Sequence, residues 1–163
     1  MPSSPTDAVD ARFDRLYRAE RERLWRALYA FVGNTDVASD AVAEAFAQCI
    51  RRGDEVRDPR AWVWKAAFAI ARGELQERSR WSALADSEPE APPDPSLERV
   101  LLALASLSPK QRAVILLRHY AGYRSREVAY LLGMAPATVR VHLARGRRNL
   151  ERALEENDDE DRT

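Results

Sequence analysis

Apolar residues recur at three- and four-residue spacings through two long stretches of this chain, and nowhere do they alternate with period two over a useful length. A period near 3.6 belongs to an α-helix with one buried face, whereas a half-buried strand requires alternation. The sequence therefore predicts an all-α fold. The two stretches, residues 10–81 and 97–154, each have the length of a small helical domain.

The first stretch predicts three helices. They span about 12–32, 36–52 and 58–81. Gly33 and Gly53 end the first two, because glycine adopts the left-handed conformation that closes a helix. Asp58 and Pro59 give the third helix an N-cap and a first-turn proline. The apolar spacing of this third helix predicts an inward face formed by Trp62, Ala66, Ala69 and Ile70.

The second stretch predicts four helices. They span about 97–105, 108–121, 125–132 and 136–154. Ser108, Pro109 and Gln111 supply a capping box and a first-turn proline. Gly133 ends the third helix and Pro136 opens the fourth. A short helix, a glycine turn and a second helix have the spacing of a helix-turn-helix, whose second helix enters the major groove of DNA.

Charge is distributed unevenly along the chain. The formal net charge is zero, which by itself argues against a nucleic-acid partner. However, residues 99–154 carry a net charge of +9, and residues 81–98 and 155–163 carry −5 each. The neutral total therefore conceals a basic block between two acidic stretches.

The two acidic stretches have compositions that do not support a packed core. Residues 82–96 are rich in proline and acids, which predicts a flexible linker between the two domains. Residues 155–163 are polar and acidic, which predicts a disordered tail. This tail could fold back on the basic block and weaken the binding of free protein to DNA.

The sequence offers little that could support catalysis. Cys49 is the only cysteine and the two histidines, His119 and His142, stand apart, so no disulfide or cysteine-based metal cluster is expected. There is no P-loop and no nucleophile elbow. No apolar run reaches the ~18 residues of a membrane span, and the N-terminus lacks the features of a signal peptide. We therefore predict a cytoplasmic protein that is not an enzyme, needs no cofactor or metal and does not insert into a membrane.

The last predicted helix has a dense basic face. Its outward positions are Arg140, His142, Arg145, Arg147, Arg148 and Arg152. Arginine forks match phosphate oxygens and guanine edges, so this face is suited to DNA. The alternative is a solvated basic helix without a nucleic-acid partner.

Bacterial sigma factors of the extracytoplasmic-function (ECF) type, in the sigma-70 family, have a region 4 that resembles LSPKQRAVILLRHYAGYRSREVAYLLGMAPATVRVHLARGRRNL. Their regions 2.1 and 2.2 are similar to FDRLYRAERERLWRALYAFVGNTDVASDAVAEAFAQCIRR, and their regions 2.3 and 2.4 to DPRAWVWKAAFAIARGELQERSR. The resemblance covers about residues 10–154. It implies a three-helix region 2 bundle (10–81), a linker (82–96) and a helix-turn-helix region 4 domain (97–154).

The resemblance implies a function and assigns residues to it. Such a protein binds core RNA polymerase, recognises the −35 and −10 promoter elements and directs transcription initiation. The positions facing the −35 element are Arg140, Val141, His142, Ala144, Arg145 and Arg148. Those facing the −10 element and the melted strand are Trp64, Lys65 and Phe68, where stacking and a nearby cation would hold single-stranded DNA. Those facing the polymerase β′ clamp are Asp40, Glu44 and Gln48.

Several positions depart from the family pattern or have a second interpretation. Ala43 and Ala69 stand where the family has polar residues, and Arg124 and Ala135 stand where it has serine caps. Phe68 could equally pack in the core. The pattern alone favours a solvated helix face for Asp40 and Glu44, and only the resemblance favours a contact with the clamp. The acidic linker could be a plain tether or could enter the polymerase cleft.

The partners implied by the resemblance are core RNA polymerase and promoter DNA. Contacts to the polymerase would include the β′ clamp and the β flap, the latter through the apolar side of residues 114–117. Family members are usually held inactive by an anti-sigma factor, so such a protein is also a candidate partner. The competing hypothesis is a stand-alone helix-turn-helix regulator that binds duplex DNA without polymerase.

Overall fold

A computed structural model describes residues 4–81, 94–160 and 162 of the chain. Most of the predicted linker, residues 82–93, lies outside the described part. The elements in order are α1 (Pro5–Val32), α2 (Thr35–Arg52), η1 (Gly53–Glu55), α3 (Pro59–Trp81), α4 (Pro95–Ala105), α5 (Pro109–Ile115), η2 (Leu116–Tyr120), α6 (Ser125–Leu132) and α7 (Pro136–Glu160). The described residues contain helices and no strand, which confirms the all-α prediction.

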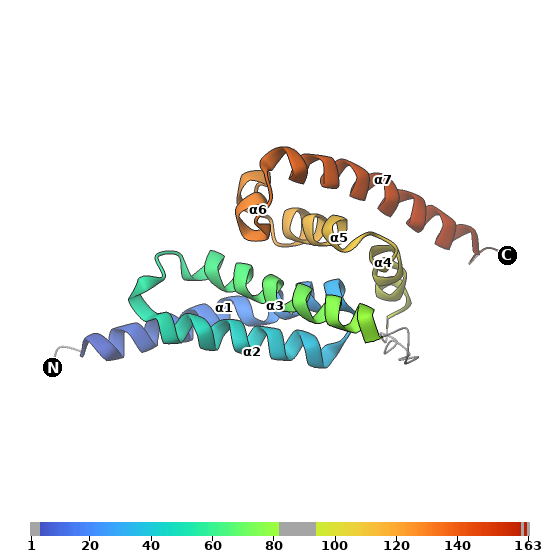
Figure 1. Cartoon of the computed structure of the whole chain (residues 1–163). Helices are drawn as coiled ribbons and strands as arrows, with labels where there is room; N and C mark the ends of the chain where they lie inside the picture. Colours follow the sequence, from blue (N-terminus) through green and yellow to red (C-terminus); the bar gives the residue numbers. More distant parts are fainter. Residues whose placement is uncertain (1–3, 82–93, 161, 163) are drawn as a thin grey trace.

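Two stacked groups of helices make up the molecule (Figure 1). The N-terminal unit, α1 to α3, is a bundle of three long helices. The C-terminal unit, α4 to α7, lies across α1 and α3, with α6 resting on α3 and α7 on the far side. One continuous set of buried side chains runs through both units. The two predicted domains are therefore packed against each other in this structure.

Local sequence signals set most helix ends. The Asn34 side chain accepts a hydrogen bond from the Val37 amide at 2.9 Å, and Asp58 accepts from the Ala61 amide at 3.1 Å. Ser108 accepts from the Gln111 amide at 3.3 Å, as a capping serine does. The predicted helix over 108–121 is α5 followed by η2, a π-helical segment.

Two helices extend beyond their predicted ends. α1 begins at Pro5 rather than near residue 12, and the Ser4 amide donates to the Asp7 carboxylate at 3.1 Å to close its first turn. α7 continues to Glu160, so residues 155–160, predicted to be disordered, are helical. Asp158 forms an ion pair with Arg99 of α4, which holds this end of α7. The acidic turns therefore lie at the opposite end of α7 from its first turns, and do not fold back on them.

The predicted inward face of α3 is correct only in part, because Trp62, Ala66 and Ile70 are half-buried against the core and do not form its centre. The buried residues of α3 are Val63, Trp64, Ala67, Phe68 and Ala71. Ala69 is exposed, while Trp62 is half-buried beneath the Arg52 guanidinium, 5.5 Å from its ring centroid. The physical reason is that α3 packs against α1 and α2 on one side and against α6 on another. A helix that is apolar on several sides has no single stripe for its spacing to reveal.

Candidate nucleic-acid interface

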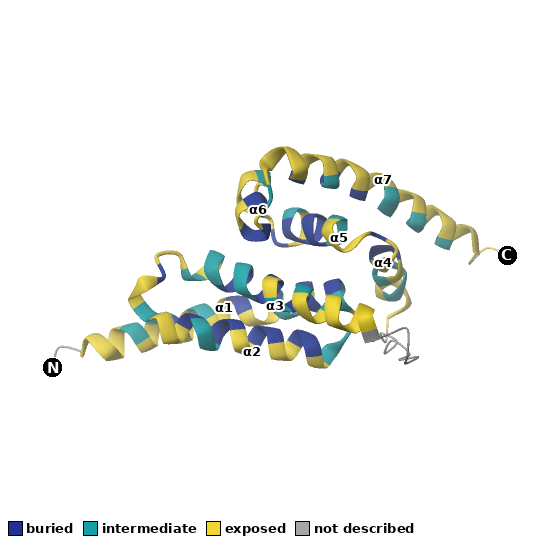
Figure 2. Cartoon of the chain, in the orientation of Figure 1, coloured by how far each residue is buried: buried dark blue, intermediate teal, exposed yellow. Residues whose placement is uncertain are grey.

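The turn between α6 and α7 confirms the predicted helix-turn-helix. Gly133 has a φ of 64°, in the left-handed region, which a residue with a side chain rarely adopts. The Met134 amide donates to the Ala129 carbonyl at 2.9 Å, which closes the turn. Val139 and Leu143 anchor α7 in the core of the C-terminal unit. This packing fixes the direction of α7 and leaves its outer face toward solvent (Figure 2).

Five of the six residues predicted to face the −35 element share this exposed face. They are Arg140, Val141, Ala144, Arg145 and Arg148. Their spacing of one, three or four residues places them on one side of a helix with 3.6 residues per turn. No acidic residue occurs from position 128 to position 150, so the only charges on this face are those of its arginines.

His142 differs from the other five. Its side chain is half-buried, and its Nδ1 atom is buried without a hydrogen-bond partner among the described residues. Burial, and then the positive charges of Lys110 and Arg145, lower the pKa of His142 below its usual value. A neutral, inward-turned imidazole is poorly placed to contact DNA. Position 142 is rotated by about 100° around the helix from Val141, which turns it from the exposed face toward the core. A list of basic residues along the sequence does not show this difference in direction.

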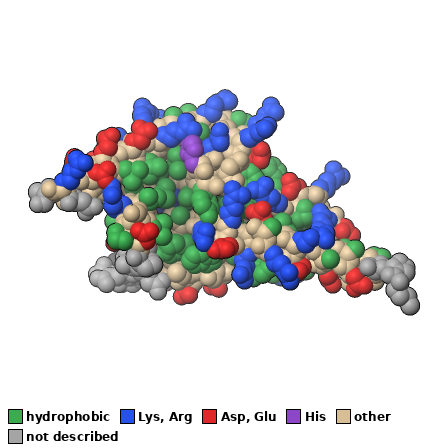
Figure 3. Space-filling view, turned by 180° about the vertical axis from the view of Figure 1, so that it is seen from behind, with side chains coloured by type: hydrophobic (Ala, Val, Ile, Leu, Met, Phe, Trp, Pro, Cys, Tyr) green, Lys and Arg blue, Asp and Glu red, His purple; other side chains and the backbone are tan. Residues whose placement is uncertain are grey.

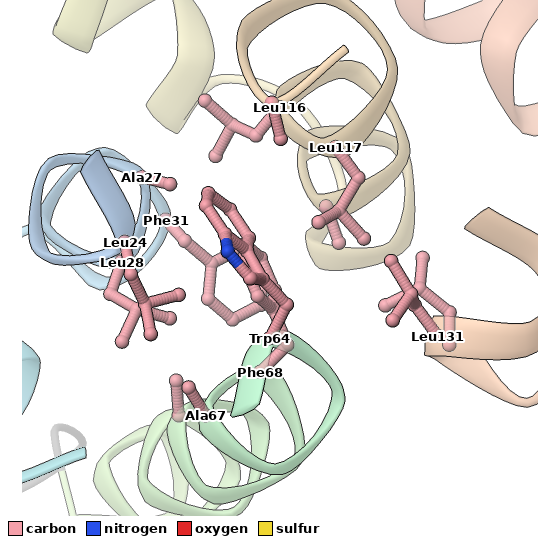
Figure 4. Packing of buried hydrophobic residues seen from close by; sticks show 14 of the residues in the cluster. Leu24, Ala27, Leu28, Phe31, Trp64, Ala67, Phe68, Leu116, Leu117 and Leu131 are labelled. Atoms are coloured by element: carbon pink, nitrogen blue, oxygen red, sulfur yellow. The ribbon is translucent and has the colours of Figure 1, made fainter. Parts of the chain in front are cut away.

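The residues predicted to meet the −10 element are not on a free surface. Trp64 and Phe68 are fully buried, and Lys65 is half-buried with its Nζ 4.2 Å from the Tyr130 ring centroid. The Trp64 indole nitrogen donates to Glu20 at 3.0 Å. In Figure 4 both rings point from α3 into the space between α1 and the C-terminal unit. In this conformation neither ring can stack on a DNA base, which corrects the expectation for Trp64 and decides the alternatives for Phe68 in favour of the core.

The predicted clamp-facing residues share the outer face of α2. Asp40 and Glu44 are exposed and Gln48 is half-buried, whereas Phe46 lies in the core beneath them. Glu44 accepts from Gln48 at 2.8 Å and from Arg51 at 3.0 Å. These two hydrogen bonds lower the pKa of Glu44. This face of α2 therefore presents two carboxylates and an amide that are already ordered by hydrogen bonds. Its contact with the β′ clamp stays a prediction.

Sequence reasoning missed a cluster between the two units. Glu20 is the one buried charged residue among the described residues, and it pairs with Arg60 at 2.9 Å. The Arg60 guanidinium lies 5.2 Å from the ring centroid of Tyr123, and burial raises the pKa of Tyr123 to about 12. One signal was available, because Glu20 interrupts the apolar spacing between Leu16 and Leu24.

The comparisons with known proteins agree with this architecture. Residues 97–150 match the family described as Sigma-70, region 4. The ECF RNA polymerase sigma factor SigL of Mycobacterium tuberculosis is 29% identical over 94% of this chain and 95% of its own length. The RNA polymerase sigma factor CarQ of Myxococcus xanthus is 30% identical over 92% of this chain and 93% of its own.

A solved structure shares the fold across both units. The sigma factor RpoE, solved in complex with the anti-sigma factor NepR from Bartonella quintana, matches with a TM-score of 0.78 at 19% identity. The match covers 88% of this chain and 96% of that one. With the near full-length likeness to CarQ and the helix-turn-helix at the expected place, this chain belongs to the RNA polymerase sigma factors of the ECF type, which direct transcription initiation.

Proposed function

We propose that α7 reads the −35 element of a promoter for this sigma factor, with Arg140 and Arg145 contacting bases or phosphates. The observation that carries the proposal is the exposed, acid-free arginine face on the second helix of a helix-turn-helix. Val141, 47% exposed, and Ala144 lie between the arginines and leave room for close approach to thymine methyl groups. The half-buried His142 is left out of the proposed contact surface.

Run-off transcription with purified core polymerase on genomic promoters tests this proposal. Arg145→Ala should weaken promoter use by ~5- to 150-fold, the equivalent of ~1–3 kcal/mol for a lost bidentate base contact. If Arg148 contacts phosphate, Arg148→Ala should weaken binding to all sequences and reduce the salt dependence by about one counterion. Arg18→Ala on α1, where the side chain is 79% exposed, is the matched control. Full activity of Arg145→Ala would contradict the assignment, and specific promoter binding without polymerase would favour the stand-alone regulator.

The exposed face of α2 is our proposed contact with the β′ clamp. Asp40, Glu44 and Gln48 supply acceptors and an amide at one-turn spacing, over a core that holds α2 rigid. Asp40→Ala with Glu44→Ala should weaken binding to core polymerase about tenfold or more, since charged contacts at interfaces carry such effects. Asp14→Ala on α1, where the side chain is 56% exposed, is the control. Equal affinity of both variants for core polymerase would remove the clamp assignment.

An anti-sigma factor is a further proposed partner. A groove of about 960 Å³ lies between α1 and the α4–η2 side of the C-terminal unit. Figure 3 shows apolar side chains gathered in a hollow on this face. Trp25, Val100 and Leu101 are among the lining residues, a composition suited to the apolar side of a partner helix.

Co-purification with a candidate anti-sigma factor encoded beside this gene tests the groove. Val100→Glu, on the groove wall, should abolish capture because it places a charge in the apolar contact. Leu102→Glu on the same helix is the control, because Leu102 is 55% exposed and does not line the groove. Equal capture by the two variants would contradict docking at this site.

The remaining expectations follow from family membership. The family acts with RNA polymerase rather than by its own chemistry, which supports a non-enzymatic role in the cytoplasm. None of the described helices is both long and apolar enough to cross a lipid bilayer. Because the family acts with RNA polymerase, the purified chain should direct transcription initiation only when core polymerase is present.

A further inference from the structure

Opposite charges occupy the two halves of the exposed side of α7. Residues 136–150 carry four arginines and no acid, whereas residues 151–160 carry six acids and one arginine. The exposed side chains include Arg145, Arg148, Glu155 and Glu156. Figure 1 shows α7 at the edge of the molecule, and Figure 2 shows its outer side exposed along the helix. One helix therefore presents a positive half and a negative half to solvent.

The two halves direct their charges the same way. At about 100° per residue, Arg145 and Glu156 differ by about 20° around the helix. Arg148 and Glu155 differ by about the same angle. A rise of about 1.5 Å per residue separates these two pairs by ~16 and ~10 Å along the axis. Ion pairs need a separation of about 4 Å or less, so these charges share a face without pairing within the helix.

The acidic end of α7 is unfavourable for an isolated helix. The C-terminal end of a helix carries partial negative charge, and the last turn of α7 holds acids and no basic residue. Arg99 offsets part of this cost through its ion pair with Asp158. Among the described residues, Glu155 and Glu156 have no ion-pair partner. Local charges that the fold leaves uncompensated point to a partner outside the chain.

A second copy of α7 is complementary to the first. If two α7 helices run antiparallel about a two-fold axis near residue 151, Arg145 of one copy lies opposite Glu156 of the other. Arg148 then lies opposite Glu155, and two-fold symmetry forms each pair twice. The macrodipoles of the two helices also run in opposite directions, which is favourable. The same face therefore supplies both sides of the contact.

One feature of the face opposes this pairing. Arg152 lies close to the axis and therefore near Arg152 of the second copy. Glu151 is adjacent to it and exposed, so each copy also brings a compensating carboxylate to the axis. Exposed ion pairs are individually weak and are screened by salt. The contact is therefore a weak one that depends on several pairs acting together.

We propose that the outer face of α7 is a self-association surface, on which two chains pair through antiparallel α7 helices. The arginines that it uses belong to the face proposed to read the −35 element. Paired chains and duplex DNA therefore compete for this face. The competition rests on the proposed function, whereas the pairing does not.

Sedimentation velocity of the whole chain at high concentration tests the pairing. A dimer fraction should be present in ~10 mM salt, where the Debye length is ~30 Å, and should disappear in ~1 M salt, where it is ~3 Å. A chain that stays monomeric in the low-salt buffer would overturn the proposal. A dimer that persists unchanged in the high-salt buffer would overturn its electrostatic origin.

Exchange of the charges locates the surface. Glu155→Arg with Glu156→Arg makes the face positive throughout, and Arg145→Glu with Arg148→Glu makes it strongly negative. Each variant alone should be monomeric in low salt, because like charges then meet. An equimolar mixture of the two should form heterodimers, because every proposed pair is restored with its signs exchanged. A dimer retained by either variant alone, or a mixture that stays monomeric although circular dichroism shows both variants folded, would overturn the antiparallel contact.

Glu74→Arg with Glu77→Arg on α3 is the matched control. Both glutamates are exposed, and the pair changes the net charge as much as the α7 variant does. This variant should dimerise like the unmodified chain, and loss of its dimer would assign the association to net charge instead of α7.

An excess of a duplex carrying the −35 element tests the competition. The duplex should convert dimers into complexes that contain one chain, and a dimer retained on the duplex would overturn the competition. Promoter use by Arg145→Ala in run-off transcription reports the proposed function separately. Full promoter use by that variant, together with a dimer of the unmodified chain, would remove the −35 assignment and leave the pairing in place.

Discussion

The two helices expected to face the promoter, α7 and α3, differ in where their predicted DNA-facing side chains lie. α7 presents arginines to solvent and buries only Val139, Leu143 and Gly146. α3 turns its two predicted DNA-facing aromatics, Trp64 and Phe68, into the core. Charged side chains stay at the surface because burying them unpaired is costly, whereas an aromatic ring gains by burial wherever an apolar surface is offered. An arginine face is therefore a safer guide to a DNA surface than an aromatic pair.

The largest expected effect tests whether Trp64 is a core residue. Trp64→Ala should lower the free energy of unfolding by ~3–5 kcal/mol, because it leaves a cavity that the bundle cannot fill. Ile50→Ala on α2, where the side chain is 54% exposed, should change it by no more than ~0.5 kcal/mol. Urea unfolding followed by tryptophan fluorescence measures the N-terminal unit, since all four tryptophans lie within residues 1–81. A loss below ~1 kcal/mol for Trp64→Ala would mean that the ring is not buried in solution.

Two glutamates of α1 sharpen the contrast between the buried contact and the surface. Glu20→Gln should cost ~1–3 kcal/mol, because the amide keeps one acceptor but sets an N–H group against a donor, Arg60 or Trp64. Glu22→Gln should cost at most ~1 kcal/mol, since the exposed pair of Glu22 with Arg26 is solvent-screened. Thermal unfolding of both variants, followed by far-ultraviolet circular dichroism, gives the comparison. Equal losses would place Glu20 in an environment like that of Glu22.

Two glycines inside helices compare the packing of the two units. A Cβ at Gly146 of α7 would lie 3.0 Å from Cγ1 of Ile115, whereas one at Gly73 of α3 would have nothing within 4 Å. Gly146→Val should therefore destabilise the C-terminal unit by ~1–3 kcal/mol through overpacking. Gly73→Ala should stabilise α3 by up to ~1 kcal/mol, because alanine favours a helix more than glycine does. Chemical unfolding followed by circular dichroism measures both changes. If Gly146→Val stabilised the chain as Gly73→Ala does, the close packing at Gly146 would be contradicted.

The smallest expected effect is a difference in acid sensitivity. Both histidines lie in the C-terminal unit, and burial, followed by nearby arginine or lysine charges, lowers the pKa of His119 and His142. The unfolded chain, with histidine pKa values near ~6.5, then binds protons more readily than the folded one. Stability of this unit should be constant well above pH 6.5 and should fall as the pH drops below it.

His119→Asn with His142→Asn should reduce that fall between about pH 7.5 and 5.5. Unfolding followed by circular dichroism measures it, and tryptophan fluorescence reports the N-terminal unit separately. That unit has no histidine, so any acid response of its fluorescence over this range should come from its contact with the C-terminal unit and should shrink in the double variant. An equal acid response in the double variant would assign the effect to other groups.

Helix positions and the helix-turn-helix could be predicted because their signals are local. Asn34, Asp58 and Ser108 accept hydrogen bonds from amides three residues ahead, and Gly33 and Gly133 adopt the left-handed turn. Such interactions depend on neighbours in sequence. The far end of α7 could not be predicted in this way, because its helical turns are supported by Arg99 of another helix.

The face of α3 and the contact between the units could not be predicted for a related reason. Trp64 and Phe68 lie among apolar side chains from α1 and from the C-terminal unit, which are distant in sequence (Figure 4). Alanine and aromatic residues occur on several sides of α3, so the sequence does not show which side is buried. The hydrogen bonds that Arg23 and Arg112 donate to backbone carbonyls of the other unit join residues more than 80 positions apart, and an arginine carries no sequence signal for a carbonyl partner.

The sequence by itself determined an all-α chain with two helical units, a helix-turn-helix and a basic outer face on its second helix. Those features follow from periodicity, capping and charge, which act over a few residues. Only the tertiary structure decided that the two units close on each other and that Trp64 faces inward. That choice depends on which apolar surfaces and which helix ends meet, and these are set by contacts between parts of the chain that the sequence keeps far apart.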